Sequence, residues 1–274
     1  MKHPLKYRLF AVVILFTALY CSADIPISPT SNDQLPDAIV GKASAPLGEA
    51  IAYFSKNPRA KGYLAVPATP DKKGAVILIH EWNGLTDRVR QMADAMAAEG
   101  YVALAADLYS GRVGTSREEN MALVRETLAD MDEIVNNLDA AASYLKGRSD
   151  VNGKVAAIGW CYGGGVALSY ALGSDNHEGT AIFYGRLLDD PEEMKKIHHE
   201  ILGTSAGLDR GITREHVDNF VKALRQAKVA NDVHVYDDVQ HGFWLHVDRD
   251  MERNQGPALD AWKRLKAYLR RTLS

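Results

Sequence analysis

The chain has 274 residues, of which 46% are hydrophobic and 24% are charged, and its formal net charge is −3. This length is sufficient for one large domain with a substantial core. Acidic residues slightly outnumber basic ones and no basic stripe is present, which argues against a nucleic acid partner.

The N-terminus has the features of a secretory signal peptide at 1–23. Three basic residues precede an apolar run at 9–19 that is too short to span a bilayer, and small residues follow it. We therefore expect cleavage after Ala23, export to the periplasm or the medium, and no stable membrane insertion afterwards. A lipoprotein site at Cys21 is the alternative, although the bulky Tyr20 stands where such sites need a small residue.

Cleavage would leave Cys161 as the one cysteine of the mature chain and would move the formal net charge from −3 to −6, because three of the 32 basic residues lie in the signal. A single thiol forms no intramolecular disulfide, and in an oxidising compartment it is a liability unless it is buried or used. The stretch at 24–46 is rich in Pro, Ser, Asp and Ala, which predicts an N-terminal arm before a domain at 47–274.

Short apolar runs alternate with amphipathic segments along this domain. Strands are expected at 50–54, 62–66, 75–79, 102–105, 155–158, 180–184, 201–203 and 233–236, and helices at 88–98, 117–145, 166–172, 213–228 and 257–273, the last with Pro257 in its first turn. The alternation predicts an α/β fold with a mostly parallel central sheet, helices on both faces and an edge hairpin formed by the first two strands. Functional groups should then lie at the carboxyl ends of the strands.

Cys161 lies on the predicted turn between a buried strand and a helix. Gly159 and Gly163 flank it at the spacing of a nucleophile elbow, which needs small residues where the helix starts close to the strand. The helix N-terminus favours thiolate over thiol, and the Tyr162 amide is a candidate oxyanion donor. The alternative is a Gly-rich turn with a buried, inert cysteine, and such turns also bind phosphates.

A nucleophile on such an elbow requires an acid and then a histidine later in the chain. His241 follows the last predicted strand by a short loop and is the candidate general base, with His246 as its nearest competitor. Asp209 follows the preceding strand and a Gly-containing loop, and it is the candidate acid. Asp237 and Asp238 are rivals, but they lie directly on the strand that leads to His241.

The segment after the first long buried strand supplies further candidates. Glu81 is expected within the site, although it could instead cap the following helix, and the Trp82 amide is the candidate second oxyanion donor. Trp160, Phe243 and Trp244 adjoin catalytic positions in sequence and are expected to line a substrate pocket. We expect no metal and no cofactor.

Together these segments resemble the dienelactone hydrolase family. The matching stretches are 62–67, 80–85, 93–94, 100–109, 159–164, 207–209 and 241–243. The resemblance implies an α/β-hydrolase fold and a triad of Cys161, His241 and Asp209 that cleaves a small-molecule ester or lactone through an acyl-thioester. It also implies that Glu81 pairs with the thiol in the resting enzyme and helps to release the thiolate when substrate binds.

One position departs from the family pattern. Founding members place a substrate-binding arginine four residues after the catalytic histidine, where this chain has Leu245. We therefore expect neutral apolar substrates to be preferred over anionic dienelactones, unless Arg88, Arg112 or Arg186 reaches the pocket. The alternative functions are a non-catalytic ligand-binding protein and a thiol redox sensor; a thiol–disulfide oxidoreductase would lack its second cysteine.

Overall fold

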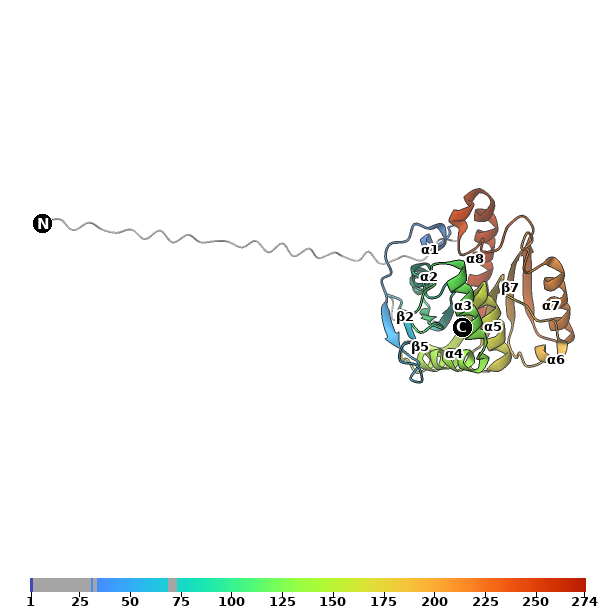
Figure 1. Cartoon of the computed structure of the whole chain (residues 1–274), viewed down its shortest axis with the longest axis horizontal. Coiled ribbons are helices and arrows are strands. Elements are labelled where there is room, and N and C mark those ends of the chain that lie inside the picture. The colour runs from blue at the N-terminus through green and yellow to red at the C-terminus, as the bar shows by residue number, and fades with distance from the viewer. Residues whose placement is uncertain (2–30, 32–33, 69–72) are drawn as a thin grey trace.

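The computed structural model describes Met1, Ser31 and residues 34–68 and 73–274 (Figure 1). Eight strands form one sheet in the order β1-β2-β4-β3-β5-β6-β7-β8. The strands are β1 (Glu49–Ala52), β2 (Lys61–Ala65), β3 (Lys73–Ile79), β4 (Val102–Ala106), β5 (Val151–Trp160), β6 (Gly179–Phe183), β7 (Ile201–Ala206) and β8 (Asn231–Tyr236). The β1–β2 and β2–β4 pairs are antiparallel and all others are parallel, which confirms the predicted edge hairpin and the mostly parallel sheet.

Helices cover both faces of this sheet, because alternate strand residues point to opposite sides. In β3, Val76 and Leu78 join the core beneath one helical layer, whereas Ile77 and Ile79 join the core beneath the other. The first layer contains α1 (Asp37–Val40), α2 (Asp87–Ala98) and α8 (Met251–Leu273), and the second contains α3 (Arg117–Leu128), α4 (Met131–Lys146), α5 (Tyr162–Gly173), α6 (Pro191–Met194) and α7 (Arg214–Gln226). The α/β fold class is thereby confirmed.

The amphipathic stretch at 117–145 is two helices rather than the one expected. Helix α3 ends at Leu128, and Asp130 then caps α4 by accepting a hydrogen bond from the Glu133 amide at 3.0 Å. An aspartate at an N-cap offers the backbone an alternative to continuing the helix. Because the apolar spacing persists across the break, the hydrophobic pattern alone did not reveal it.

Helix α8 starts earlier than expected, at Met251, so Pro257 lies inside it and not in its first turn. Its N-cap is Asp250, whose carboxylate accepts the Arg253 amide at 3.2 Å. Proline lacks an N–H and was therefore expected in the first turn, where no donor is needed; here it lies further into the helix, which forgoes one internal hydrogen bond.

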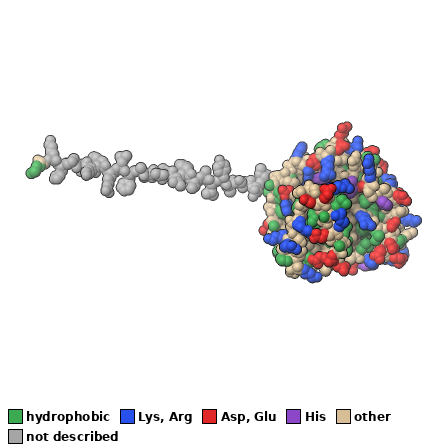
Figure 2. Space-filling model, in the orientation of Figure 1, with side chains coloured by type: hydrophobic (Ala, Val, Ile, Leu, Met, Phe, Trp, Pro, Cys, Tyr) green, Lys and Arg blue, Asp and Glu red, His purple; other side chains and the backbone are tan. Residues whose placement is uncertain are grey.

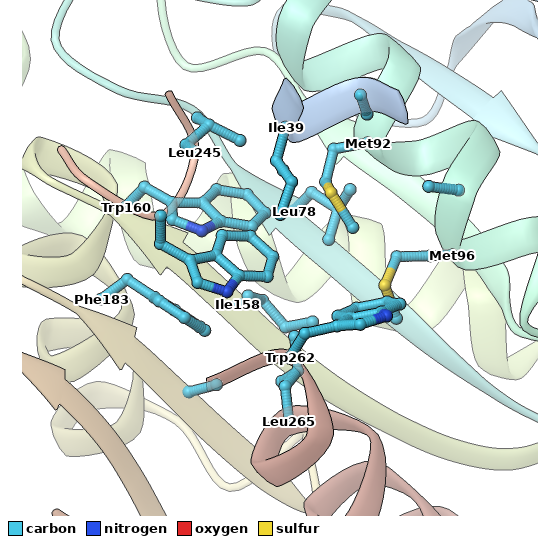
Figure 3. Close-up of a cluster of buried hydrophobic side chains, with 14 of the residues drawn as sticks. Ile39, Leu78, Met92, Met96, Ile158, Trp160, Phe183, Leu245, Trp262 and Leu265 are labelled. Carbon is cyan, nitrogen blue, oxygen red and sulfur yellow. The ribbon is translucent and has the colours of Figure 1, made fainter. Parts of the chain in front are cut away.

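Part of the predicted arm packs against the domain. Residues 37–40 form α1, and Ile39 is fully buried in the core beside Met92 and Trp160 (Figure 3). Arg88 donates a hydrogen bond to the Ala38 carbonyl. The predicted signal peptide beyond Met1, its cleavage site and the lipoprotein alternative lie outside the described residues.

Basic and acidic side chains are interspersed on the face of the domain drawn in Figure 2. Within the described ranges, no helix is both long enough and apolar enough to cross a membrane.

Candidate active site

The turn between β5 and α5 is a strained elbow with Cys161 at its apex. Cys161 has φ 56° and ψ −117°, a conformation that costs a non-glycine residue about 1–3 kcal/mol. The turn is tight because a Cβ on Gly159 would lie 1.9 Å from the Gly163 carbonyl oxygen, and one on Gly163 would lie 2.3 Å from that of Ile79. Glycine at these two positions is thus a steric requirement, and it leaves the Cys161 side chain partly accessible at the helix N-terminus.

The loops after β7 and β8 bring an acid and a histidine to the same edge. Asp209 Oδ2 lies 2.6 Å from His241 Nδ1, although the two residues are 32 positions apart. The other carboxylate oxygen of Asp209 accepts the amides of Gly211 and Ile212 at 2.8 and 3.1 Å. Cys161 and His241 border the same cavity. The structure therefore brings together the nucleophile, base and acid that the sequence indicated.

Electrostatics around this chain of hydrogen bonds favour a charged histidine. Burial alone would lower the pKa of His241, but its hydrogen bond to Asp209 and its interaction with Cys161 outweigh that effect and raise the pKa to about 10. Burial likewise opposes ionisation of Asp209, yet the hydrogen bonds from His241 and from the Ile212 amide hold the pKa of this carboxyl below its usual value. His241 is thus set up to hold a proton and to pass it on.

The rival residues lie elsewhere. Asp237 is an exposed residue whose carboxylate pairs with Arg214 at 2.9 Å, whereas the hydrogen-bond partner of His241 is Asp209. His246 binds neither Cys161 nor Asp209; its Nε2 lies 2.6 Å from Glu81 Oε2.

Glu81 therefore has a different partner from the one that the family resemblance implies. Among the described residues no hydrogen bond joins it to Cys161, and its carboxylate is bound by His246 in a site where the two side chains are only 10% and 14% exposed. Sequence reasoning considered His246 only as a competing base. No local pattern could have revealed the pair, because its members are 165 residues apart.

His80 fixes the backbone of the Glu81 segment. The Leu108 amide donates to His80 Nε2 at 3.3 Å, so the proton of the ring lies on Nδ1 and is donated to the Glu81 carbonyl at 2.7 Å. Burial lowers the pKa of His80, which keeps it neutral. This residue was missed as a contributor to the site, since a fully buried histidine beside a strand gives no signal of its own.

The two predicted oxyanion donors, the amides of Trp82 and Tyr162, follow the carboxyl ends of adjacent strands. Ile79 pairs with Gly159 at the carboxyl ends of β3 and β5, so the segments that carry Trp82 and Tyr162 leave the sheet side by side. Tyr162 is the first residue of α5, and its N–H has no partner within the helix. In the part of the chain that is described, the Trp82 amide donates to no backbone acceptor. Both residues border the cavity beside Cys161.

A cavity of about 520 Å³ opens beside Cys161 and His241. Its walls come mainly from α3, α4, α5 and the loop after β6, and most of its surface is apolar. The lining residues are Trp82, Val124, Leu128, Met131, Cys161, Tyr162, Gly165, Val166, Leu168, Ser169, Leu172, Tyr184, Arg186, Leu187, Leu188, Ile212 and His241. This volume suits one small organic molecule.

The expectation that Trp160, Phe243 and Trp244 line the pocket is wrong for this cavity. All three are buried in the core, with at most 2% exposure, and none borders the cavity. Trp160 stacks on Trp244 with ring centroids 5.8 Å apart, and it points into the core near Leu78 and Ile158 in Figure 3. Trp160 ends β5 and faces the core side of the sheet, because side chains alternate along a strand, whereas Phe243 and Trp244 lie in the turn after His241 and pack inward.

The three arginines that could bind an anionic substrate differ in whether they border the cavity. Arg88 binds Asp248 at 2.8 Å, Arg112 forms two hydrogen bonds with Glu126, and neither arginine borders the cavity. Arg186 borders the cavity, is exposed, and lies on the loop after β6. Leu245 is fully buried in the core.

Within residues 34–68 and 73–274, no three His, Cys, Asp or Glu side chains are grouped as metal ligands would be. The residues at the site are those of acyl transfer: a thiol on an elbow, a histidine, a carboxylate and free amides. Fold and site together define an α/β hydrolase.

Comparison with known proteins gives the family. The model of the "Dienelactone hydrolase family" matches residues 60–273. A "Putative carboxymethylenebutenolidase" of Saccharolobus solfataricus is 30% identical over 256 residues, and the match covers 81% of this chain and 97% of the relative. A protein of the same name from Methylorubrum extorquens is 27% identical, and that match covers 76% of this chain and 75% of the relative. The crystal structure of a dienelactone hydrolase-like promiscuous phosphotriesterase, P91, shares the fold with a TM-score of 0.73 at 21% identity, covering 84% of this chain and all of its own. The chain belongs to the dienelactone hydrolase family and is a hydrolase.

Proposed function

We propose that this protein hydrolyses carboxylic esters or lactones with Cys161 as nucleophile and an acyl-thioester as intermediate. The observation that carries the proposal is the hydrogen bond between Asp209 and His241 at the edge of an open cavity that Cys161 also borders. A nucleophile, a base within hydrogen-bond reach and a group that orients the base are the parts that covalent acyl transfer requires.

In the first half of the reaction, the Cys161 thiolate attacks the carbonyl carbon, and the carbonyl π electrons move to the oxygen. The amides of Trp82 and Tyr162 stabilise this oxyanion. When the oxyanion collapses, the carbon–oxygen bond to the alcohol breaks, and His241 donates its Nε2 proton to the departing alkoxide. The acyl group remains on sulfur as a thioester.

In the second half, His241 accepts a proton from water as the water oxygen attacks the thioester. The second oxyanion forms at the same two amides and then collapses, expelling the Cys161 thiolate and releasing a carboxylic acid. With a lactone the alcohol stays tethered to the acyl group, so the product is one hydroxy acid. Asp209 holds the imidazole in the tautomer that both steps need.

The cavity supports substrates with an apolar acyl or alcohol group. Aliphatic side chains of three helices, including Val124, Leu128 and Leu172, form much of its wall, and they favour groups that lose little hydration on entry. The volume of about 520 Å³ favours a small molecule over a polymer.

The test is hydrolysis of a panel of activated esters and lactones before and after alkylation with iodoacetamide. Mass spectrometry should locate the label on Cys161, and hydrolysis should stop in proportion to labelling. Cys161→Ala should lower kcat by about 10³-fold or more. Cys161→Ser is the matched control for fold, since it keeps the size of the side chain. Undiminished hydrolysis by Cys161→Ala would refute the proposed nucleophile.

A further inference from the structure

We infer that the cavity beside Cys161 is a groove for a straight acyl chain, so that the preferred substrates are esters of unbranched aliphatic acids of about eight to ten carbons. The inference rests on the proposed function and narrows it to one substrate class. It also assigns Leu172 as the residue that sets the upper limit of chain length.

The cavity follows one side of helix α5. Cys161 stands immediately before the first residue of this helix, and Gly165, Ser169 and Leu172 border the cavity further along it. Successive members of this set are three or four residues apart, a spacing that places them in line on one side of a helix. All four are half-buried, whereas Ala167 on another side of α5 is fully buried in the core.

The cavity is elongated along this line. Cys161 and Leu172 are eleven positions apart, which is about 16 Å along a helix axis. A round cavity of about 520 Å³ would be only about 10 Å across, so a cavity of this volume that borders both residues has to be longer than it is wide.

The length of the groove gives the length of the chain. A leucine side chain in a helix leans toward the N-terminus, so that of Leu172 fills about the last turn, or about 5 Å of the path. About 11 Å remain, and an extended chain advances about 1.2 Å per bond. The groove therefore accepts about nine bonds beyond the carbonyl carbon.

The side chains along this path are largely apolar. Leu128 at the end of α3, Met131 at the start of α4 and Leu188 on the loop after β6 all border the cavity. Leu128 and Leu188 are 41% and 39% exposed, and a bound chain would cover them. The Ser169 hydroxyl donates to the Gly165 carbonyl at 3.1 Å, so it needs no partner from the substrate. A methylene chain, which brings apolar surface and no polar group, matches such a wall.

Arg186 is the charged residue beside the first turn of the groove. A Cβ on Gly165 would lie 3.3 Å from Arg186 Cβ, which places the stem of this side chain against α5. Arg186 is exposed, so its guanidinium can stay in water while its stem borders the chain.

The position of His241 indicates which half of the ester enters the groove. In the proposed reaction His241 donates a proton to the leaving alkoxide, so the alcohol oxygen has to lie beside this ring. Ile212 also borders the cavity, and its amide binds Asp209, the partner of His241, at 3.1 Å. The alcohol therefore points toward His241 and Ile212, and the acyl chain follows α5 from Cys161 toward Leu172.

The test is kcat/KM for para-nitrophenyl esters of straight-chain acids from acetate to palmitate. The value should rise about two- to fourfold with each added methylene up to about ten carbons and then level off or fall, because only methylenes inside the groove are removed from water. Leu172→Trp should end the rise about three carbons earlier, and Leu172→Ala about two carbons later, as the side chain at the end of the groove grows or shrinks.

Leu47→Trp is the matched control, since Leu47 is 46% exposed and borders a different cavity. Its ratio of kcat/KM for decanoate to that for acetate should equal the wild-type ratio. A second series, acetates of straight-chain alcohols, should show no length limit that moves in the Leu172 variants. A flat acyl profile, a limit that neither Leu172 variant moves, or a Leu172-dependent limit in the alcohol series would overturn the inference.

Binding separates this inference from the proposed function. Calorimetry should show that methyl decanoate binds to Cys161→Ala with a negative heat-capacity change, and that adding Leu172→Trp weakens binding by about tenfold or more. Equal binding by the two proteins would contradict the groove. Absence of hydrolysis of every ester by wild type would instead refute the proposed function, whereas hydrolysis that is independent of acyl length would overturn only the inference.

Discussion

Replacing Asp209 by asparagine would test whether the negative charge of Asp209 holds His241 in the tautomer that the proposed reaction needs. The carboxylate is 3% exposed and binds His241 Nδ1 at 2.6 Å, while its other oxygen accepts the Gly211 and Ile212 amides. Asparagine keeps the shape and one acceptor oxygen for those amides. It loses the negative charge, and its NH₂ group then faces Nδ1, which favours the tautomer with the proton on the wrong nitrogen.

The expected loss in kcat is about 10³- to 10⁴-fold, the size that follows when such a base is held in the wrong tautomer. The fold should persist. One charge-assisted hydrogen bond is worth about 1.5–3 kcal/mol when fully buried, and the 40% exposure of His241 reduces this to about 1 kcal/mol of unfolding free energy.

The difference in unfolding free energy between wild type and Asp209→Asn should depend on pH. The raised pKa of His241, about 10, means that its contribution is fully present below the unfolded value of about 6.5 and is lost as pH rises through about 10. The lowered pKa of Asp209 means that its contribution is present above the unfolded value of about 4 and is lost as pH falls through the folded pKa. Wild type should therefore exceed Asp209→Asn most in stability between about pH 4 and 6.5.

Urea unfolding at several pH values measures the stability difference, and kcat/KM on one activated ester measures the catalytic effect. Asp237→Asn is the matched control, because its carboxylate is 77% exposed and pairs only at the surface with Arg214. It should change kcat/KM by less than about twofold and stability by less than about 1 kcal/mol. The opposite ranking of the two variants would refute the assignment of Asp209 as the orienting acid.

Two further predictions concern substrate charge and export. A neutral lactone should have a kcat/KM at least about tenfold higher than a matched anionic dienelactone. Arg186→Gln should change kcat/KM for the anion by no more than about fivefold, because Arg186 is exposed and exposed ion pairs contribute about 1 kcal/mol or less. A preference for the anion that Arg186→Gln abolishes would contradict this prediction. We also propose that the chain is exported, so N-terminal sequencing of the mature protein should begin at Asp24, whereas a lipid-modified Cys21 at the N-terminus would favour the lipoprotein alternative.

The sequence determined those features that depend on local geometry or on chain order. Gly159 and Gly163 around Cys161 predicted the elbow, because a Cβ at either position would collide with the backbone that the turn brings close. The order of Asp209 and His241 after the elbow predicted their meeting, because parallel strands bring all their carboxyl ends to one edge.

Only the tertiary structure decided which side chains meet across that edge. Trp160 ends the strand before Cys161, yet it faces the core layer of α2 and α8, because strand residues alternate between the two faces. The position of Glu81 just after a buried strand predicted that it lies at the site. Its contact with His246 could not be predicted, since His246 comes from a loop 165 residues away in the sequence. Such long-range pairs leave no periodicity in the chain, and they form only when packing brings their loops into contact.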